Sequence, residues 1–355
     1  MGDIHAKNTG YVGPCFFLKG GKELTLEDYG WDSHFETEFH RIKKTGFVPA
    51  RVCRVEKDRY FLHNGVSAYE GVLSGKFRSQ TRKKSDLPTI GDWVVLKKPS
   101  GSFGLIEMLL RRKNALSRKT AGMVTEEQLI SANVDAAMIF SALDQDLSIP
   151  RIERYLLLCA QCAIEPFCVF NKLDLCSSLE EALTKTQMLR PDVQRFFISV
   201  QNHTGISELL PYFGKGKTVV LLGSSGVGKT SFINAIAPNL SGKTQEVRVT
   251  DHKGKHTTTW RELVLLPGGG LLVDNPGMRE VQLWADKDAL EDTFEDILAL
   301  ESACRFRNCS HLSEPGCAVL RAVENGQLRE ERLENYRKLK AEINRLTVRR
   351  KEVGR

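Results

Sequence analysis

The pattern of apolar and polar positions changes twice along this chain. Residues 46–115 hold short β-type runs, such as 48–52 and 93–96, separated by turn signals at Asn64-Gly65 and Ser74-Gly75. Closely spaced strands with glycine turns predict a small β-barrel of the OB type. From about residue 130, apolar strands alternate with segments of helical spacing, which predicts a mainly parallel sheet with helices on both faces. Beyond about residue 285 the chain is charged and helical.

These changes divide the chain into four expected parts. Residues 1–45 form an extension with a short helix around 26–41, and residues 46–115 form the barrel. Residues 116–285 form the α/β domain, and residues 286–355 form a helical domain that ends in a basic amphipathic helix. In the α/β domain we expect strands at residues 136–140, 167–170, 196–200, 218–222, 263–266 and 271–273, and helices at 152–163, 206–213 and 229–236.

Composition narrows the class of protein. A length of 355 residues fits two or three domains, and no run approaches the roughly 20 apolar residues that span a bilayer. The first residues lack a secretory pattern, so we expect a cytoplasmic protein without membrane contact. Nine cysteines is an odd number, and a reducing compartment argues against a disulfide framework. The net charge of +7 hints at an anionic partner.

Two nucleotide-binding motifs occur in reversed order. Gly223-Ser224-Ser225-Gly226-Val227-Gly228-Lys229-Thr230 is a complete G-x-x-x-x-G-K-[ST] phosphate loop between a predicted strand and a predicted helix. Its glycines let backbone N–H groups wrap phosphates, Lys229 would reach the β- and γ-phosphates, and Thr230 would hold Mg²⁺. Asn171-Lys172-Leu173-Asp174, an N-K-x-D guanine motif, precedes it, whereas in an ordinary GTPase it follows. The order indicates a chance match or a circularly permuted GTPase.

The N-K-x-D segment follows an apolar strand, where α/β sheets place ligand-binding loops. Asp174 would accept hydrogen bonds from guanine N1 and N2, a donor pair that adenine lacks. Asn171 would bond the base edge and brace the phosphate loop, and the Lys172 stem would cover the ring. Ser199 and Val200, at another strand end, fit the loop that backs the base.

Downstream motifs complete the order. Asp274-Asn275-Pro276-Gly277 fits D-x-x-G: Asp274 would bind Mg²⁺ through water, and the Gly277 N–H would sense the γ-phosphate. A switch threonine must come from residues 257–259, and we favour Thr258 or Thr259. The position after D-x-x-G, where many GTPases carry a glutamine that orients water, is Met278. Slow intrinsic hydrolysis is therefore expected, with His256 positioning the water; alternatively, His256 is a solvated loop histidine.

A cysteine and histidine cluster lies near the C-terminus. Cys304, Cys309, His311 and Cys317 fall within 14 residues and make a complete Cys₃His set, which suits a closed structural Zn²⁺ site. The alternative is a set of scattered core cysteines. Cys159 and Cys162, by contrast, sit on an apolar helical face and are interpreted as buried thiols.

The five nucleotide motifs and the Cys₃His set resemble those of the circularly permuted GTPases, and most closely the ribosome small-subunit-dependent GTPase A (RsgA/YjeQ) family, over about residues 46–330. Asn275 departs slightly from the family pattern. The resemblance implies zinc at the Cys₃His set, Mg²⁺ with GTP at Thr230, Asp274 and Thr259, and catalysis by His256, Lys229, Thr258 and Thr259. It implies GTP or GDP contacts at Asn171, Lys172, Leu173, Asp174, Ser199, Val200, Gly223, Ser224, Ser225, Gly226, Val227, Gly228, Lys229, Thr230, Ser231, Asp274 and Gly277.

The expected partner is an anionic polymer. Residues 76–84, read as a barrel loop, carry five basic side chains, and the C-terminal helix carries more, although either could be an ordinary solvated surface. The resemblance implies the small ribosomal subunit and its rRNA, and a role in late subunit maturation. We also expect a monomer, since nothing in the sequence suggests an obligate dimer. The alternative function is a GTP-regulated RNA-binding module whose hydrolysis is incidental. An ATP-using kinase is disfavoured by Asp174.

Overall fold

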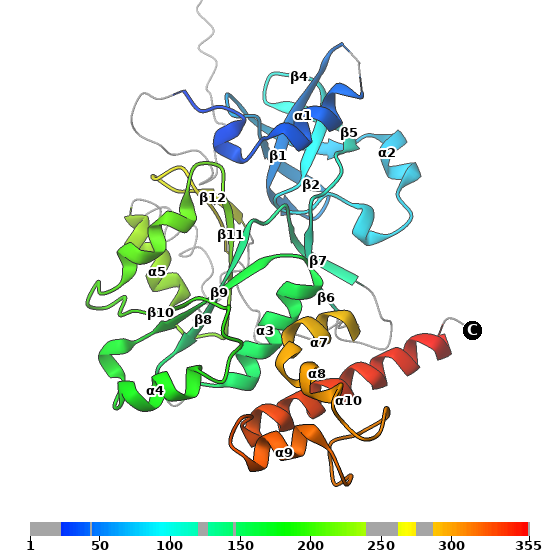
Figure 1. Ribbon diagram of the computed structural model, residues 1–355. Coiled ribbons are helices and arrows are strands. Elements are labelled where there is room, and N and C mark those ends of the chain that lie inside the picture. Colours follow the sequence, from blue (N-terminus) through cyan, green and yellow to red (C-terminus); the bar gives the residue numbers. More distant parts are fainter. Residues whose placement is uncertain are drawn as a thin grey trace, which may run out of the picture.

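The computed structural model describes residues 23–42, 45–119, 127–144, 147–238, 262–274 and 287–353. A β-barrel lies above an α/β sheet, and the C-terminal helices lie below it against one side of that sheet (Figure 1). Within these residues, no helix is both long and apolar enough to cross a bilayer.

The barrel consists of five strands and closes on itself. They are β1 (Phe47–Glu56), β2 (Arg59–His63), β3 (Ala68–Leu73), β4 (Trp93–Ser100) and β5 (Phe103–Leu109). Strand β1 pairs antiparallel with both β2 and β4, and β3 pairs parallel with β5, so the barrel is closed as predicted. Alternate residues point inward, and these form a small buried core that includes Ala50, Val52, Leu62, Leu96 and Ile106.

The basic stretch 76–84 is not the simple loop that the sequence indicated. It contains helix α2 (Gly75–Gln80) and a short 3₁₀ turn at Lys84–Asp86. The Ser74 hydroxyl caps α2 by accepting a hydrogen bond from the Phe77 N–H at 3.2 Å. Phe77 packs against the barrel core, so one apolar side chain and one cap are enough to fix this short helix.

The segment before the barrel covers part of its outer surface. It contains a 3₁₀ turn at Glu27–Tyr29 and helix α1 (Ser33–His40), which is shorter than the predicted span. The Trp31 ring meets Trp93 of β4 edge-on at a centroid distance of 4.7 Å, and Phe35 packs beside it. These aromatic contacts make the segment an integral part of the barrel's packing.

A two-stranded sheet, β6 (Ala115–Lys119) and β7 (Glu127–Ala132), connects the barrel to the α/β sheet. The α/β strand order is β10-β9-β8-β11-β13-β12. The strands are β8 (Ala136–Ala142), β9 (Glu165–Asn171), β10 (Arg195–Phe197), β11 (Thr218–Leu222), β12 (Glu262–Leu265) and β13 (Leu271–Asp274). All neighbours are parallel except β12 and β13, which form a hairpin. The predicted mainly parallel sheet is therefore confirmed.

Each face of this sheet has its own apolar core. Ala137, Ile139 and Val220 pack with helix α3 (Ile149–Gln161), whereas their strand neighbours pack with the 3₁₀ helix Ile206–Phe213 and helix α5 (Lys229–Ile236). Helix α4 (Leu179–Thr186) lies between β9 and β10 in the sequence. Because both faces are covered, the central strands read as continuous apolar runs.

The barrel and the α/β sheet share one continuous hydrogen-bonded sheet. Strand β1 pairs antiparallel with β12 at Arg54 and Glu262, so eleven strands join in a single order. On the same strand, the Arg51 guanidinium is only 1% exposed and donates hydrogen bonds to the carbonyls of Tyr29, Gly91 and Asn133 and to the Thr218 hydroxyl. Burial lowers the pKa of Arg51 to about 10. One side chain thus links four segments of the chain.

The C-terminal helices dock on α3 through buried charges. They are α7 (Lys287–Thr293), α8 (Glu295–Glu301), α9 (Ala318–Glu324) and α10 (Glu330–Val353), with α10 running along the bottom of the molecule (Figure 1). Arg332 of α10 bonds Glu153 of α3 at 2.6 Å and Asp296 of α8 at 2.6 Å. A second pair joins Arg154 of α3 to Glu342 of α10 at 2.7 Å. Burial raises the pKa of Glu153 to about 7, against the opposing effect of Arg332.

Candidate functional site

The phosphate loop follows the central strand β11, whose five residues are all buried. Gly228 ends the loop with φ +99° and is the residue before α5. A Cβ at Gly228 would lie 2.1 Å from Asn171 Nδ2, so only glycine fits here. The loop therefore depends on glycine at position 228, because Gly228 takes a backbone conformation that other residues rarely adopt.

The Lys229 ammonium lies over this loop. Its Nζ donates hydrogen bonds to the carbonyl oxygens of Gly223 at 2.7 Å and Ser224 at 2.6 Å. Lys229 is also the first residue of α5, whose N-terminal end carries a partial positive charge. Ser225, Thr230 and Ser231 are exposed around it. A lysine ammonium and a helix N-terminus at one loop form an anion-binding arrangement.

Asn171 joins the N-K-x-D segment to the phosphate loop. Its Nδ2 donates to the Val227 carbonyl at 2.9 Å, and its Oδ1 accepts from the Val200 N–H at 3.1 Å. Asn171 is 3% exposed, so both bonds are shielded from water. One amide thus connects three segments that sequence reasoning had placed in three separate motifs.

Asp174 stays exposed beside this junction, in the short turn Leu173–Leu175. The Ser199 hydroxyl donates to Asp174 Oδ1 at 2.5 Å and accepts from the Asn202 N–H, so it orients the carboxylate. Lys172 has φ +66°, and its ammonium pairs with Asp144 at 2.8 Å beyond the end of β8. The two predicted base-binding segments therefore meet in space, around a carboxylate that is open to a ligand.

One contact to the phosphate loop was missed by sequence reasoning. Arg151, in the first turn of α3, donates to the Ser224 hydroxyl at 3.0 Å. Asp144 was missed in the same way. Neither belongs to a motif. The available signal was that Asp144 closely follows β8 and that Arg151 lies at the start of the next helix, at the end of the sheet where the loops gather.

Part of the predicted site lies outside the described residues. His256, Thr258 and Thr259 fall within 251–261, and Gly277 and Met278 fall within 275–286. Asp274 is described as the last residue of β13, where its backbone pairs with Glu262. Since β13 runs parallel to β11, Asp274 lies at the same edge of the sheet as the phosphate loop.

The Cys₃His set converges as predicted. The ligand atoms of Cys304, Cys309, His311 and Cys317 all lie within 4.8 Å of one another. The His311 Nδ1 is 3.3 Å from the Cys317 sulfur, and its Nε2 lies 2.7 Å from the Glu301 carboxylate. That carboxylate fixes the ring so that Nδ1 faces the thiols. The cluster can hold a metal ion.

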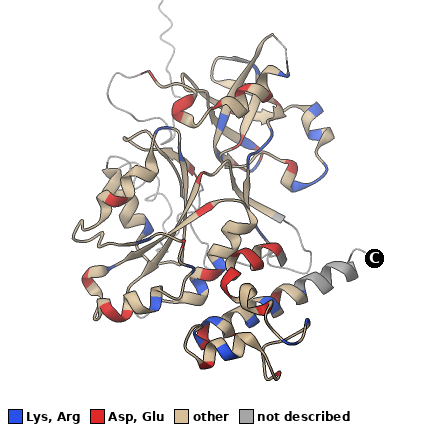
Figure 2. Cartoon of the chain, viewed as in Figure 1, with Lys and Arg blue, Asp and Glu red and all other residues tan. Residues whose placement is uncertain are grey.

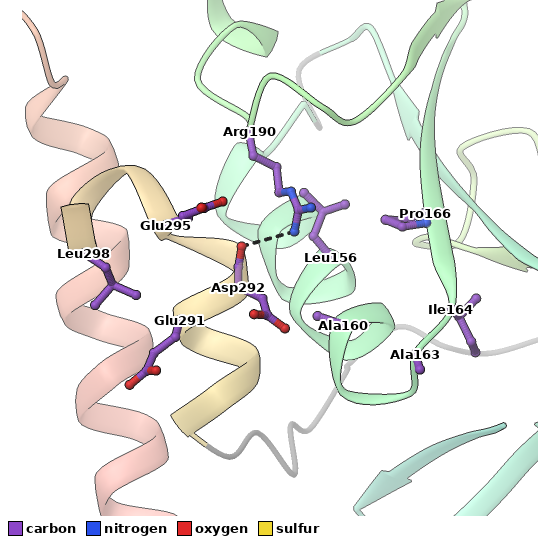
Figure 3. A pocket seen from close by; sticks show the side chains of 10 residues that line it. All are labelled: Leu156, Ala160, Ala163, Ile164, Pro166, Arg190, Glu291, Asp292, Glu295 and Leu298. Carbon is purple, nitrogen blue, oxygen red and sulfur yellow. Dashed lines mark hydrogen bonds between the residues drawn. The ribbon is translucent and has the colours of Figure 1, made fainter.

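One cavity in the described residues lies away from these loops. It has a volume of about 490 Å³ and opens between α3 and the helices α7 and α8. Figure 3 shows Glu291 and Asp292 of α7 across from Leu156 and Ala160 of α3, with the Arg190 guanidinium bonded to the Asp292 carbonyl at 3.2 Å. Its acidic wall disfavours phosphate. The nucleotide site is therefore expected at the strand-end loops.

A parallel sheet whose central strand enters a phosphate loop, braced by an N-K-x-D asparagine from an earlier strand, defines a circularly permuted GTPase. A family model described as RsgA GTPase matches residues 109–284. Curated relatives are similar over most of the chain, and on these grounds the chain belongs to the RsgA GTPase family and is a GTP hydrolase.

Relatives and solved structures agree on this family. The small ribosomal subunit biogenesis GTPase RsgA of Opitutus terrae is 36% identical over 329 residues, covering 90% of each chain. That of Methanosarcina acetivorans is 38% identical over 321 residues, covering 88% of this chain and 84% of its own. YjeQ from Thermotoga maritima superposes with a TM-score of 0.62 at 29% identity, over 84% of this chain and 98% of its own. YloQ, described as a circularly permuted GTPase, gives 0.61 at 25% identity, over 85% and 96%.

Proposed function

We propose that this chain is a GTPase activated by the small ribosomal subunit, which binds rRNA and acts late in the maturation of that subunit. The observation that carries the nucleotide part is the contact of Asn171 with the phosphate loop at Val227 and with the base-backing loop at Val200. It brings a guanine-reading carboxylate and an anion-binding loop to one edge of the sheet. The ribosomal part rests on the names of the relatives.

In this proposal the predicted residues keep their roles. The loop from Gly223 to Thr230, with Ser231, binds the phosphates, and the segments Asn171–Asp174 and Ser199–Val200 bind guanine. Mg²⁺, when bound at Thr230, Asp274 and Thr259, would neutralise the charge that develops on the phosphates. The proposed domains are an N-terminal extension at residues 1–45, the barrel at 46–115, the GTPase domain at 116–285, and a zinc-binding domain with a C-terminal basic helix at 286–355.

Zinc fits the Cys₃His set. A tetrahedral ion with Zn–S bonds of about 2.3 Å separates its sulfur ligands by about 3.8 Å. The sulfurs of Cys304 and Cys317 are 3.8 Å apart. Three thiolates and one imidazole fill all four positions, so Cys304, Cys309, His311 and Cys317 would hold a structural zinc ion and not a catalytic one.

His256 is proposed to position the attacking water, because Met278 cannot accept or donate a useful hydrogen bond there. His256→Ala should lower turnover, while the affinity for GTP changes little. His252→Ala is a matched control in the same stretch of the chain and should leave turnover unchanged. Equal turnover in wild type and His256→Ala would remove His256 from the mechanism.

The basic surface of the barrel supports an RNA partner. Lys76 and Arg78 on α2, with Arg82, Lys83 and Lys84 after it, gather on one side of the barrel (Figure 2). All five of these side chains are exposed. Clustered cations of this kind attract the phosphates of a nucleic acid, and their effect weakens with salt.

The deciding experiment is the rate of GTP hydrolysis with and without purified small subunits. Strong stimulation supports an enzyme that the subunit activates. Binding to the subunit without stimulation would instead favour the alternative, a GTP-regulated RNA-binding module whose hydrolysis is incidental. Competition by GDP and ADP against a fluorescent GDP tests the base: ADP competing as well as GDP would contradict the role of Asp174.

A further inference from the structure

The contact between the barrel and the GTPase sheet lies at the nucleotide edge of that sheet. Strand β12 begins at Glu262, which pairs with Arg54 of β1 on one side and with Asp274 of β13 on the other. Glu262 follows Thr259 by three positions in the sequence. The barrel therefore touches the strand that starts just after the switch threonines and lies beside the D-x-x-G aspartate.

An ion pair holds this contact. Arg54 Nη1 is 3.0 Å from Glu262 Oε1, and the two side chains are 10% and 13% exposed. The Arg54 guanidinium also stacks over the Phe61 ring at 4.0 Å and lies 3.0 Å from Glu56. A shielded pair of this kind, with one partner fixed by neighbours on the barrel, is stronger and more directional than an exposed ion pair.

The other arginine of this strand acts at the opposite edge. Arg51 donates a hydrogen bond to Thr218, at the start of β11. Arg54 instead pairs with Glu262, which lies opposite Asp274 at the end of β13. Because β11 and β13 are parallel, the start of one and the end of the other lie at opposite edges of the sheet. Arg51 therefore fixes the barrel on the sheet, and Arg54 is the β1 arginine that lies at the nucleotide edge.

We propose that Arg54 is a positioning residue for GTP hydrolysis, which acts through Glu262 to hold the start of β12 in register with Asp274. The position of the barrel, which is proposed to bind RNA, thereby determines the position of β12 beside Asp274 at the nucleotide edge of the sheet. The proposal rests on the proposed function, since it takes Asp274 as the residue that binds Mg²⁺ through water.

The test measures kcat and KM for GTP, with and without small subunits, in Arg54→Gln and Glu262→Gln. Loss of one charge-assisted bond should lower kcat roughly tenfold while KM and GDP affinity stay within about twofold. Arg54→Lys keeps a cation over Phe61 and should recover most of the rate. Glu70→Gln is the matched control, because it removes the exposed Arg59–Glu70 pair of the same barrel, at 2.9 Å.

The outcomes separate this inference from the proposed function. If wild type binds no GDP or shows no hydrolysis, the proposed function fails. If wild type is active and both Gln variants keep its kcat, only the positioning role is wrong. Parallel losses in kcat, GDP affinity and melting temperature, or an equal loss in Glu70→Gln, would also overturn it, because they indicate general destabilisation. Glu262→Gln decides the question if Arg54→Gln does not fold.

Discussion

Substituting Gly228 by alanine should separate the phosphate loop from the guanine loop. Two effects act together. The first is backbone strain, since φ is +99° at Gly228 and a non-glycine residue in such a conformation costs about 1–3 kcal/mol. The second is a clash, because the new Cβ would lie 2.1 Å from Asn171 Nδ2. To relieve it, the Asn171 side chain must move and give up its bonds to Val227 and Val200.

The magnitude follows from these two buried hydrogen bonds. At about 1–1.5 kcal/mol each, their loss costs about 2–3 kcal/mol beyond the strain, which sets an upper limit of about 30- to 150-fold on the loss of nucleotide affinity. Gly226→Ala supplies the matched control, because Gly226 has φ +85° in the same loop but an added Cβ there meets no atom within 4 Å. Within the protein, Gly226→Ala therefore costs backbone strain and makes no clash.

Equilibrium binding of a fluorescent GDP measures the difference between Gly228→Ala and Gly226→Ala. Asn171→Ala removes the Nδ2 atom with which the new Cβ clashes. In that background, Gly228→Ala should therefore weaken GDP binding no more than Gly226→Ala does. The reasoning is refuted if both glycine variants weaken binding equally in the wild-type background, or if the extra cost of Gly228→Ala persists without Asn171.

Three further predictions follow from other parts of the structure. Cys309→Ser should lose bound zinc, measured by metal analysis, while Cys162→Ser on α3 keeps it; retention in both would contradict the Cys₃His site. Arg51→Met should lower the free energy of unfolding by about 2–4 kcal/mol. The buried oxygen atoms that lose their hydrogen bonds to Arg51 cost more than is gained by removing a buried charge. The urea transition can be followed by the fluorescence of Trp93, whose ring centroid lies 5.5 Å from the guanidinium carbon. Glu153 should make stability fall as pH rises from about 4.5 to about 7, because its folded pKa is raised and the folded state holds a proton that the unfolded chain releases. Urea midpoints of wild type relative to Glu153→Gln should therefore decline over that window and level off above it, and a constant difference would refute the assignment.

The sequence predicted the parts of the site that local pattern specifies. Strands such as β9 and β11 are apolar because both faces are covered, and they end where Asn171 and the phosphate loop begin. The Cys₃His set was readable because metal ligands need a compact spacing. The prediction of two strands after the phosphate loop, near Leu263 and Leu271, is confirmed by the hairpin of β12 and β13.

The contacts between domains could not be predicted in this way. Arg51 and Arg54 lie in a barrel strand, where charged residues normally face water, and their partners Thr218 and Glu262 are 167 and 208 positions away. Nothing in the local pattern marks such a pair. Helix α2 was missed for a related reason, since its basic residues are exposed and its position depends on the Ser74 cap and the packing of Phe77.

Strand β12 is the last strand of the GTPase sheet, and its outer side would present unpaired backbone groups if the barrel were absent. Such an exposed edge can pair with another chain and lead to aggregation. Strand β1 covers it at Glu262, while the opposite edge, β10, is only three residues long. We therefore expect the barrel to limit edge-to-edge association of the GTPase sheet. A shortened chain that begins after the barrel would expose this edge and should self-associate, even if its nucleotide site remained intact.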